Sequence, residues 1–476
     1  MTVATARRGR AVHRVRRGRH RLPAVGTGPP EATPRAGPGP PSKVEASPLV
    51  FPSRAARHPP GPTRRSRRRG FFNARSLASC MHPAREIRGN ASSLLEGTRI
   101  ALGVTGSIAA VETVKLAREL ARHGAEVVPF ASPAALDILH PYALEFATGH
   151  EPVTELTGQV EHLVGVKGEV DAVLMAPATA NSISKTALAI DDTPVTSLVS
   201  TSLGHVPVIV VPAMHEGMLD QERTRQHVDT LEDEGAAVVD PELEEGEAKM
   251  ASIEAVTETV IRELGPGPFE GERVLVVNGS TIETIDEMRV VTNQSTGRTG
   301  AALAREAYRL GADVDMWFGH GHVDLPETVP RERFVTVQDL VDLAPEAAAY
   351  DWVLVPAAIS DFQAKPSDGK LPSGEDQVLP LEPTPKVLPE LRAELDGGQR
   401  LVGFKAEAGI DEDDLTAKAA RFRKENRLEA VVANRLEDVD VDDTRVHLVT
   451  DAATTPIEGS KEAVARRVLQ TLHEEV

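Results

Sequence analysis

Short apolar runs alternate with stretches of helical periodicity from about residue 95 onward. The first run, at residues 100–104, leads through a Gly-Ser turn into a predicted helix of about four turns that ends near Arg122. Further apolar runs, each followed by helical sequence, lie at residues 126–130, 172–176 and 206–211. Apolar strands separated by helices are typical of a parallel sheet covered on both faces. The first half is therefore predicted to be a doubly wound α/β domain.

The pattern stops at the Gly-Pro-Gly-Pro sequence of residues 265–268 and then starts again. In the second half a helix is expected at 299–310, and strands are expected at 273–277, 314–318, 352–355, 401–404 and 430–433. We predict a tail at 1–94, an α/β domain at 95–264, a linker at 265–271 and a second doubly wound α/β domain at 272–476. No short internal repeat is visible in the sequence, so the two halves are similar architectures rather than an array.

Charge is distributed unevenly along the chain. Residues 1–90 hold 20 Arg and Lys against 3 Asp and Glu, whereas residues 91–476 hold 33 against 68. A surplus of carboxylates keeps a surface hydrated where salt screens charge over short distances, so the body is interpreted as a cytoplasmic protein of a halophile. The tail mixes Arg, Pro and Gly with almost no hydrophobic periodicity. It is predicted to be disordered, or to reflect a start placed too early, with Met81 as the alternative beginning.

Composition argues against several classes of function. A nucleic-acid arm or a transit peptide would be basic like the tail, but the tail lacks interleaved aromatic residues for base stacking. No apolar run approaches the roughly 20 residues that span a bilayer. The sole cysteine, Cys80, lies in the tail, so disulfides and Cys-based metal sites are excluded for the body. Neither nucleic acid nor a membrane is expected as a partner, and no protein metal site is predicted.

Two segments of the first half favour an anion site. The sequence Thr-Gly-Ser at 105–107 follows a strand and opens a helix, which directs backbone N–H groups and a hydroxyl toward an anion. Such a turn is as often only a helix cap, so alone it decides nothing. The sequence Ala-Pro-Ala-Thr-Ala-Asn at 176–181 follows another strand, at the edge where open α/β sheets bind ligands. Its small residues leave room for a flat ring, so together the two segments predict a mononucleotide site.

A similar turn occurs in the second half. The sequence Ser-Thr-Gly-Arg at 295–298 precedes the predicted helix at 299–310. Backbone N–H groups at such a helix start can hold phosphate in the same way. Each half therefore carries its own candidate phosphate site, which predicts two active sites in one chain.

These motifs resemble those of known enzyme families. Residues 103–110, 176–181 and the sequence Pro-Ala-Met-His-Glu-Gly-Met at 212–218 resemble the FMN-dependent cysteine decarboxylases that make phosphopantetheine. Residues 289–300, Ala-Ala-Ile-Ser-Asp at 357–361 and Val-Gly-Phe-Lys-Ala-Glu at 402–407 are similar to phosphopantothenoylcysteine synthetase. In this order they resemble the bifunctional coenzyme A biosynthesis flavoproteins over residues 95–475. The resemblance implies a flavodoxin-like or Rossmann-like FMN domain followed by a Rossmann-like CTP-dependent ligase domain.

The resemblance implies that FMN in the first domain oxidises the cysteinyl thiol of the substrate to a thioaldehyde, so that the neighbouring carboxylate leaves as from a β-keto acid. His162 matches the family's active-site histidine and is expected to act as a base. Outside the family, a lone histidine would more often be surface or core filler. The residues implied to contact FMN are Gly106, Ser107, Ile108, Ser132, Ala178, Thr179 and Asn181.

This chain departs from the family at two points. The substrate-clamping motif of the family reads Pro-Ala-Met-Asn, but here Met214 is followed by His215, whose imidazole can still donate to a carboxylate. Bacterial members carry a cysteine on a flexible flap, and the corresponding residues 245–250 contain none. Either Lys249 donates the proton to the enethiolate, or Lys249 is a solvated surface residue and the decarboxylase half is impaired.

For the second domain the resemblance implies that CTP activates 4′-phosphopantothenate as an acyl-cytidylate, which cysteine then attacks; ATP stays open as the alternative nucleotide. Lys370 is expected to neutralise phosphate charge, Asn293 to hold the acyl-cytidylate, and Arg289 to bind substrate. Mg²⁺ is implied by the triphosphate, held largely by its oxygens and water. The implied nucleotide contacts are Ser295, Gly297, Arg298, Ala357, Ala358, Asp361, Lys370, Pro385, Phe404 and one or both of Lys418 and Lys424.

Three functions stay open at this point. The first is a bifunctional ligase and decarboxylase, the second is a ligase with an impaired flavin domain, and the third is a non-catalytic regulator, since relatives of the flavin domain serve as phosphatase-binding subunits. His162 argues against the regulator, because a binding module needs no base there. The resemblance also implies homo-oligomers, with trimeric flavin domains and dimeric ligase domains. Residues 131–146 are either the trimer contact or simply core, and residues 445–450 are the candidate dimer strand.

Overall fold

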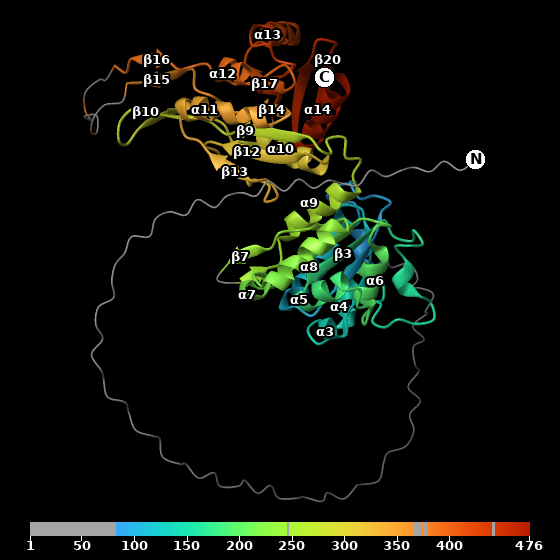
Figure 1. Cartoon of the computed structure of the whole chain (residues 1–476). Helices are drawn as coiled ribbons and strands as arrows, with labels where there is room; N and C mark the ends of the chain where they lie inside the picture. Colours follow the sequence, from blue (N-terminus) through green and yellow to red (C-terminus); the bar gives the residue numbers. More distant parts are fainter. Residues whose placement is uncertain (1–81, 245–246, 366–368, 370–373, 375–377, 440–442) are drawn as a thin grey trace, which may run out of the picture. The chain divides into compact units, whose positions relative to one another are not determined.

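The computed structural model describes residues 82–244, 247–365, 369, 374, 378–439 and 443–476. Within these residues the chain forms two α/β halves, each built on its own sheet (Figure 1). Each half has hydrophobic core on both faces of its sheet. The predicted class of two doubly wound α/β domains is therefore confirmed.

The first half contains a parallel five-stranded sheet in the order β2-β1-β3-β4-β6. This is the flavodoxin-like order 2-1-3-4-5, in which the direction of winding reverses between the first and third strands. A separate three-stranded sheet has the order β5-β8-β7. The strands are β1 (Arg99–Val104), β2 (Glu126–Ala131), β3 (Ala172–Ala178), β4 (Val208–Pro212), β5 (Met214–His215), β6 (Ala236–Val238), β7 (Glu242–Glu244) and β8 (Glu247–Lys249).

Helices cover both faces of the first sheet. Side chains of α2, α4 and α9 belong to the core on one face, and those of α5, α6 and α8 to the core on the other. The predicted first helix is split into a 3₁₀ turn, η2, and α2, a common way for an α-helix to begin. The helices are α1 (Pro83–Glu86), η2 (Ile108–Glu112), α2 (Thr113–Arg122), α3 (Pro133–Leu136), α4 (Pro141–Thr148), η3 (Glu161–Leu163), α5 (Ala180–Ala187), α6 (Pro194–Ser202), α7 (Glu216–Leu219), α8 (Glu222–Asp233) and α9 (Ile253–Leu264).

The second half contains an eight-stranded sheet in the order β13-β12-β9-β14-β17-β18-β19-β20. Its first six strands are parallel and follow the Rossmann order 3-2-1-4-5-6, whereas β19 and β20 are antiparallel. The strands are β9 (Arg273–Asn278), β10 (Ile282–Thr284), β11 (Val290–Thr292), β12 (Asp313–Phe318), β13 (Arg331–Arg333), β14 (Trp352–Val355), β15 (Phe362–Ala364), β16 (Leu381–Pro383), β17 (Arg400–Glu407), β18 (Ala430–Arg435), β19 (Asp443–Val449) and β20 (Thr454–Ser460).

Helices also cover both faces of the second sheet. Side chains of α10 and α14 pack on one face, and side chains of α11, α12 and α13 pack on the other. Two small antiparallel sheets, β10 with β11 and β15 with β16, lie outside the main sheet. The helices are α10 (Arg298–Arg309), α11 (Val337–Leu343), η4 (Ala344–Ala349), α12 (Val387–Glu394), α13 (Glu412–Glu425), η5 (Leu436–Asp438) and α14 (Lys461–Glu475).

Two of the predicted boundaries are corrected. Residues 82–94 belong to the folded body rather than to the tail, because Ala84 is buried and the Gly89 N–H donates to the Ala121 carbonyl at 3.0 Å. Phe269, which was expected in the linker, is fully buried beside Trp352 and His473. The Gly and Pro residues around Phe269 are typical of a linker, but its ring completes the second core. The remaining tail, residues 1–81, lies outside the described residues.

Helix α9 contacts α10 of the second half through charged side chains. Arg309 donates to both carboxylate oxygens of Glu258, at 2.5 and 2.6 Å, and its side chain is only 9 % exposed. Arg262 donates to the carbonyls of Tyr308 and Gly311, at 3.2 and 2.8 Å, where the end of α10 leaves carbonyl groups unsatisfied. A buried charge needs such partners to offset its loss of hydration, so these contacts hold α10 against α9.

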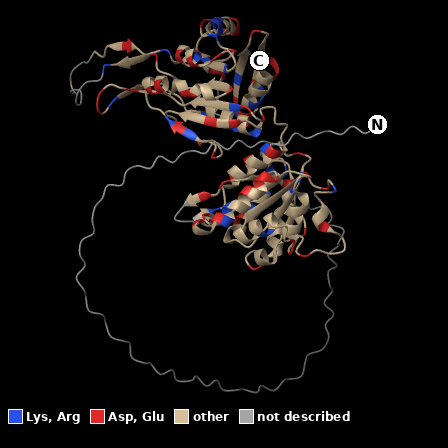
Figure 2. Ribbon diagram, viewed as in Figure 1, with Lys and Arg blue, Asp and Glu red and all other residues tan. Residues whose placement is uncertain are grey.

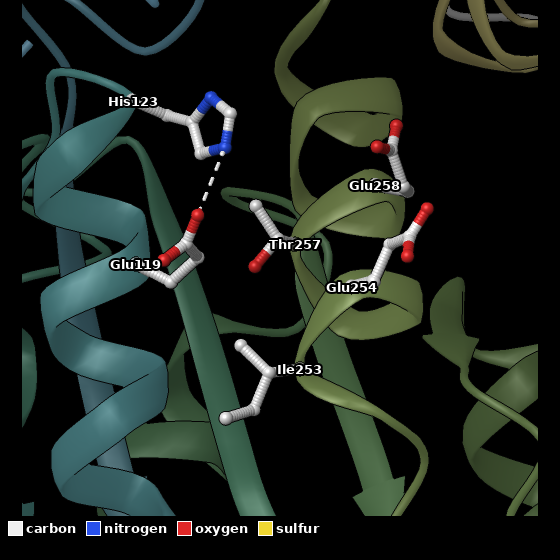
Figure 3. A pocket seen from close by; sticks show the side chains of 6 residues that line it. All are labelled: Glu119, His123, Ile253, Glu254, Thr257 and Glu258. Atoms are coloured by element: carbon white, nitrogen blue, oxygen red, sulfur yellow. Dashed lines mark ion pairs between the residues drawn. The ribbon is translucent and has the colours of Figure 1, made fainter. Parts of the chain in front are cut away.

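A pocket lies between the C-terminal end of α2 and helix α9, and Figure 3 shows its lining residues Glu119, His123, Ile253, Glu254, Thr257 and Glu258. The His123 Nε2 lies 3.6 Å from a Glu119 carboxylate oxygen. Burial, reinforced by the charge of Arg309, lowers the pKa of His123. The ten residues of α2, about 15 Å long, and the five residues of η2 separate this pocket from the Gly-Ser turn. None of the predicted site residues lines it.

Acidic and basic residues occur along the ribbon of both halves of the described chain (Figure 2). Among the described residues, no helix is both long and apolar enough to cross a membrane. The same residues contain no group of three or more His, Cys, Asp or Glu arranged to hold a metal ion. The halophile interpretation stays a prediction.

Candidate functional sites

The first candidate site lies where the winding of the first sheet reverses, between β1 and β3. Thr105, the residue after β1, donates its hydroxyl proton to the Pro177 carbonyl at 2.7 Å and accepts from the Thr179 N–H at 3.0 Å. Two segments that are 74 residues apart in sequence are thus joined at the carboxyl ends of neighbouring strands. Ligands of open α/β sheets bind at this reversal point.

The Gly-Ser turn is packed closely against the segment that follows β2. A Cβ placed on Gly106 would lie 2.5 Å from the Ala134 Cβ, so a side chain has no room there. Ser132 precedes Ala134, and its N–H donates to the Val104 carbonyl at 3.0 Å. Ser107 caps η2 by accepting from the Ala109 N–H. The predicted FMN residues Gly106, Ser107, Ser132, Ala178 and Thr179 are therefore grouped around the carboxyl ends of three adjacent strands.

We expect Gly106→Ala to lower FMN retention at least about tenfold, because the added methyl group must displace the turn or the Ala134 backbone. The check is the flavin absorbance of the purified chain, per mole of protein. The matched control is Gly158→Ala, because a Cβ at Gly158 would meet nothing within 4 Å. Equal flavin contents in the two variants would contradict this placement of the cofactor.

The predicted substrate clamp and the flap lie in one small sheet. Met214 and His215 form β5, which pairs with β8 so that Met214 is opposite Ala248. Lys249, the next residue on β8, is exposed. His215 is also exposed, and its Nδ1 accepts from the Gly217 N–H at 3.1 Å. The structure thus brings the clamp residues and Lys249 together, although they are more than 30 residues apart in sequence.

His162 lies in η3 and is held against α6. The Thr201 hydroxyl donates to the His162 backbone carbonyl at 2.7 Å. The His162 Nδ1 is buried and has no hydrogen-bond partner among the described residues. No hydrogen bond within the described chain joins His162 to the Gly-Ser turn, so its place at the flavin site stays a prediction.

The residues present fit FMN at the reversal point. A helix start with a serine and a tight glycine turn suits the phosphate. Ile108, directly after the turn, is 76 % exposed, which is unusual for a large apolar side chain beside a core and suits contact with a flat ring. Asn181, in the first turn of α5, is exposed as well. The buried Nδ1 of His162 has no hydrogen-bond partner among the described residues, a state that a bound ligand would relieve.

The second candidate site lies where the winding of the second sheet reverses, between β9 and β14. Ser280, two residues after β9, forms a bridge to Ala358, and the Ala358 N–H donates to the Gly279 carbonyl at 2.8 Å. Asn293 is exposed, and its side-chain amide donates to the Ala358 carbonyl at 3.2 Å. The predicted acyl-cytidylate residue therefore lies directly on the predicted cytosine segment, which includes Ala357.

The predicted phosphate turn is anchored on the same strand end. The buried Asn278 amide donates to the Gly297 carbonyl at 3.0 Å. A Cβ on Gly300 would lie 2.2 Å from the Asn278 side chain, so only glycine allows α10 to approach this closely. Gly297 is the N-cap of α10 and provides no side-chain cap. The Arg298 N–H, the first of α10, donates to the Thr296 hydroxyl at 3.4 Å. The following N–H groups of this helix start, with Ser295 and Arg298 beside them, are the candidate phosphate site.

Arg289 is held by a carboxylate that the sequence analysis did not single out. Its Nη1 lies 2.5 Å from the Asp286 Oδ2, and the Asp286 side chain is fully buried. The Arg289 N–H also donates to Asp286, at 2.7 Å. Asp286 therefore fixes the turn that places Arg289 directly before β11, whereas Asn293 directly follows the same strand.

Asp361 is paired with a second residue that the sequence analysis missed. The Lys386 Nζ lies 2.5 Å from the Asp361 Oδ1, and both side chains are largely exposed. The Thr384 N–H donates to the Asp361 carbonyl at 3.1 Å, which brings Pro385 beside it. Such an exposed pair contributes little stability, so both groups are available to a ligand. Lys370, the predicted loop lysine, lies outside the described residues.

The remaining nucleotide contacts lie on β17 and α13. Phe404 is half-buried and lines a pocket with Thr299, Asn434 and Lys461. The Lys418 Nζ lies 3.0 Å from a carboxylate oxygen of Glu407, the last residue of β17. Lys424 is in the last turn of α13, at the end away from the carboxyl edge of the sheet. Lys418 is therefore the better placed of the two to reach a phosphate.

Sequence reasoning identified most of these segments but missed the residues that fix them. Thr105 was included only as part of a turn, and Asp286 and Lys386 were not selected at all. Asp286 lies three residues before Arg289, a spacing typical of a side chain that caps its own turn. No sequence signal pointed to Lys386, because its partner is 25 residues away.

Two family models match this chain. The Flavoprotein family matches residues 88–265, and the DNA/pantothenate metabolism flavoprotein C-terminal domain matches residues 269–476. The coenzyme A biosynthesis bifunctional protein CoaBC of Thermococcus kodakarensis is 44 % identical over 78 % of this chain and 93 % of its own length. The protein of the same name from Methanocaldococcus jannaschii is 37 % identical over 83 % and 98 %. A crystal structure of the C-terminal domain of a CoaBC protein is 28 % identical over 44 % of this chain and 97 % of its own, with a TM-score of 0.36.

Proposed function

The chain belongs to the family of bifunctional coenzyme A biosynthesis proteins, and we propose that it carries out two successive reactions, a ligation and a decarboxylation. In the first, cysteine is joined to 4′-phosphopantothenate at the expense of CTP with Mg²⁺. In the second, phosphopantothenoylcysteine loses CO₂ to give 4′-phosphopantetheine. The observation that carries the proposal is that the segments predicted to hold FMN meet at the winding reversal of the first sheet, and that Asn293 meets Ala358 at the winding reversal of the second.

In the ligase half, an oxygen of the substrate carboxylate attacks the α-phosphate of CTP, and pyrophosphate leaves. Negative charge grows on phosphate oxygens, so the required groups are donors and cations held in advance. Asn293 supplies an amide beside Ala358, and Arg289 supplies a guanidinium held by Asp286. The α10 start would bind phosphates, and Lys370, which lies outside the described residues, is proposed as a further cation. The amine of cysteine then displaces CMP from the acyl group.

In the decarboxylase half, FMN would be held by Gly106, Ser107, Ser132 and Thr179, and when bound it would supply both the oxidation of the thiol and, after CO₂ is lost, the return of the same two electrons to the enethiolate. His162 takes a proton from the substrate through its unpaired ring nitrogen. His215 holds the substrate carboxylate, and Met214 borders it. Lys249, on the strand beside them, donates a proton to the enethiolate that decarboxylation leaves. If Lys249 has this role, the decarboxylase half is active rather than impaired. The position of Lys249 on β8, beside β5, supports the role.

We also propose that the chain acts as a homo-oligomer in the cytoplasm. In the first half, exposed Ile108, Val111, Tyr142 and Phe146 support a contact with another copy. In the second half the expected strand at 445–450 is corrected, because β19 is hydrogen-bonded on one side to β18 and on the other to β20. The small sheets β10–β11 and β15–β16, with exposed Met288, Val290 and Phe362, are the better candidate for a dimer contact.

A mass-spectrometric assay tests the proposal. The purified chain, in high salt with FMN and Mg²⁺, is given 4′-phosphopantothenate, cysteine and either CTP or ATP. We expect phosphopantetheine to form with CTP. Accumulation of phosphopantothenoylcysteine alone would leave a ligase with an impaired flavin half, and product with ATP only would correct the nucleotide. No product with either nucleotide would leave the non-catalytic regulator as the surviving alternative.

A further inference from the structure

We propose that His320 and His322 bind the phosphate group of 4′-phosphopantothenate in the ligase half, an inference that rests on the function proposed above. The two histidines lie in the loop Gly-His-Gly-His at residues 319–322, directly after β12. Neither histidine belongs to the predicted site residues or has a role in the proposed reactions. Their placement, their unpaired rings and their distance from Asn293 each support the inference.

The loop is fixed between the two parts of the candidate ligase site. His320 and Ser280 exchange two backbone hydrogen bonds, at 2.7 and 2.8 Å, and Ser280 also bridges to Ala358. The His322 N–H donates to the Thr296 carbonyl at 3.1 Å, in the turn that precedes α10. The backbone of both histidines is thus tied to the residues that surround the proposed substrate.

The imidazole rings themselves are available. Their centroids lie 4.9 Å apart at an interplanar angle of 83°. Neither ring forms a hydrogen bond or an ion pair with another described residue, and His322 is exposed. The exposed Arg333 faces the same strand end, because it pairs with Phe318 in register and its guanidinium lies 5.1 Å from the Phe318 ring centroid. Three side chains that can carry positive charge therefore gather at the carboxyl ends of β12 and β13.

The distance between this cluster and Asn293 matches the length of the acid substrate. Strand β12 is separated from β14 by one strand, β9, so their carboxyl ends are two strand spacings apart, or about 10 Å. Nine bonds separate the carboxylate carbon of phosphopantothenate from its phosphorus, which equals three extended residues, or about 10 Å. A substrate whose carboxylate lies at Asn293 can therefore place its phosphate at the histidines.

A phosphate group bound by the two histidines could belong either to the acid substrate or to the nucleotide. The start of α10, Arg298 and Lys418 are already assigned to the nucleotide, whereas no other residue set is assigned to the phosphate of the acid. This division of roles favours the acid substrate. The two sources predict different kinetic effects.

The test is steady-state ligation by the full chain carrying His320→Gln, His322→Gln or both. We expect each single change to raise the KM for 4′-phosphopantothenate about tenfold with kcat retained, because one charge-assisted hydrogen bond is lost. The KM for CTP should stay within about twofold. Inhibition by pantothenate, which lacks the phosphate, should not change, and His322→Lys should keep the low KM because it restores a cation.

Several results would overturn the inference. Unchanged KM values for the acid would do so, as would a rise confined to the KM for CTP, which would assign the cluster to the nucleotide. An equal weakening of pantothenate inhibition would show an effect unrelated to phosphate. Decarboxylation of supplied phosphopantothenoylcysteine by the same variants reports whether they fold. A wild-type chain that makes no phosphopantothenoylcysteine would overturn the ligase assignment itself, whereas an active wild type with insensitive variants would overturn the histidine assignment alone.

Discussion

Asn293→Ala is expected to lower the ligation rate by about 10²–10³-fold, the usual cost of removing one donor from a site that stabilises developing negative charge. Asn293 donates to the Ala358 carbonyl across the winding reversal of the second sheet, so its amide is already oriented before substrate binds. An oriented donor loses little on reaching the transition state, which is why the expected effect is large. The measurement is the rate of phosphopantothenoylcysteine formation at saturating CTP, cysteine and 4′-phosphopantothenate.

The chain offers two controls for this prediction. Gln294→Ala changes the exposed neighbour of Asn293 and should leave ligation within about twofold, as surface substitutions commonly do. Decarboxylation of supplied phosphopantothenoylcysteine should be unchanged in Asn293→Ala, because that reaction is assigned to the other sheet. Equal ligation rates in the two variants would remove Asn293 from the mechanism.

His162→Asn is expected to lower decarboxylation by about 10²–10⁴-fold, the range for loss of a general base. The Nδ1 of His162 is buried without a partner among the described residues, a costly state unless a ligand completes it. Asparagine keeps a polar side chain of similar reach but takes no proton near neutral pH. The measurement is phosphopantetheine formation from supplied phosphopantothenoylcysteine, together with the flavin content of the variant.

The matched control is His205→Asn, an exposed histidine in the loop between α6 and β4. It should retain full activity. Ligation should also be normal in His162→Asn, so that the two central predictions are reciprocal: each variant loses one reaction and keeps the other. Retained decarboxylation with bound flavin in His162→Asn would show that another group is the base, and Lys249 would be examined next.

Much of the fold could be predicted from local pattern. The apolar runs at 172–176, 273–277 and 430–433 all became buried strands, because a strand covered on both faces must be apolar throughout. The small outlying strands, β5, β7, β8, β10, β11, β15 and β16, were not predicted as strands. They are two or three residues long and largely exposed, so their sequences show no alternation of apolar and polar residues from which a strand could be predicted.

The candidate sites could be predicted only in pieces. The Gly-Ser turn, the segment at 176–181 and the turn at 295–298 were identified because the chemistry of each is local: a strand end, a small residue and a helix start. His320 and His322 carried no signal of this kind. Their proposed role depends on backbone hydrogen bonds to Ser280 and Thr296, which are 40 and 26 residues away in the chain.

The sequence by itself determined the two α/β halves, their chemistry-bearing turns and the family of this protein, because each depends on residues that are close in the chain or on motifs in a fixed order. The tertiary structure decided which turns meet. Thr105 contacts Thr179, Ser280 bridges to Ala358, and Lys386 pairs with Asp361, because these segments follow strands or loops that the sheet order makes neighbours. Strand order is set by packing of the whole chain and leaves no trace in local periodicity.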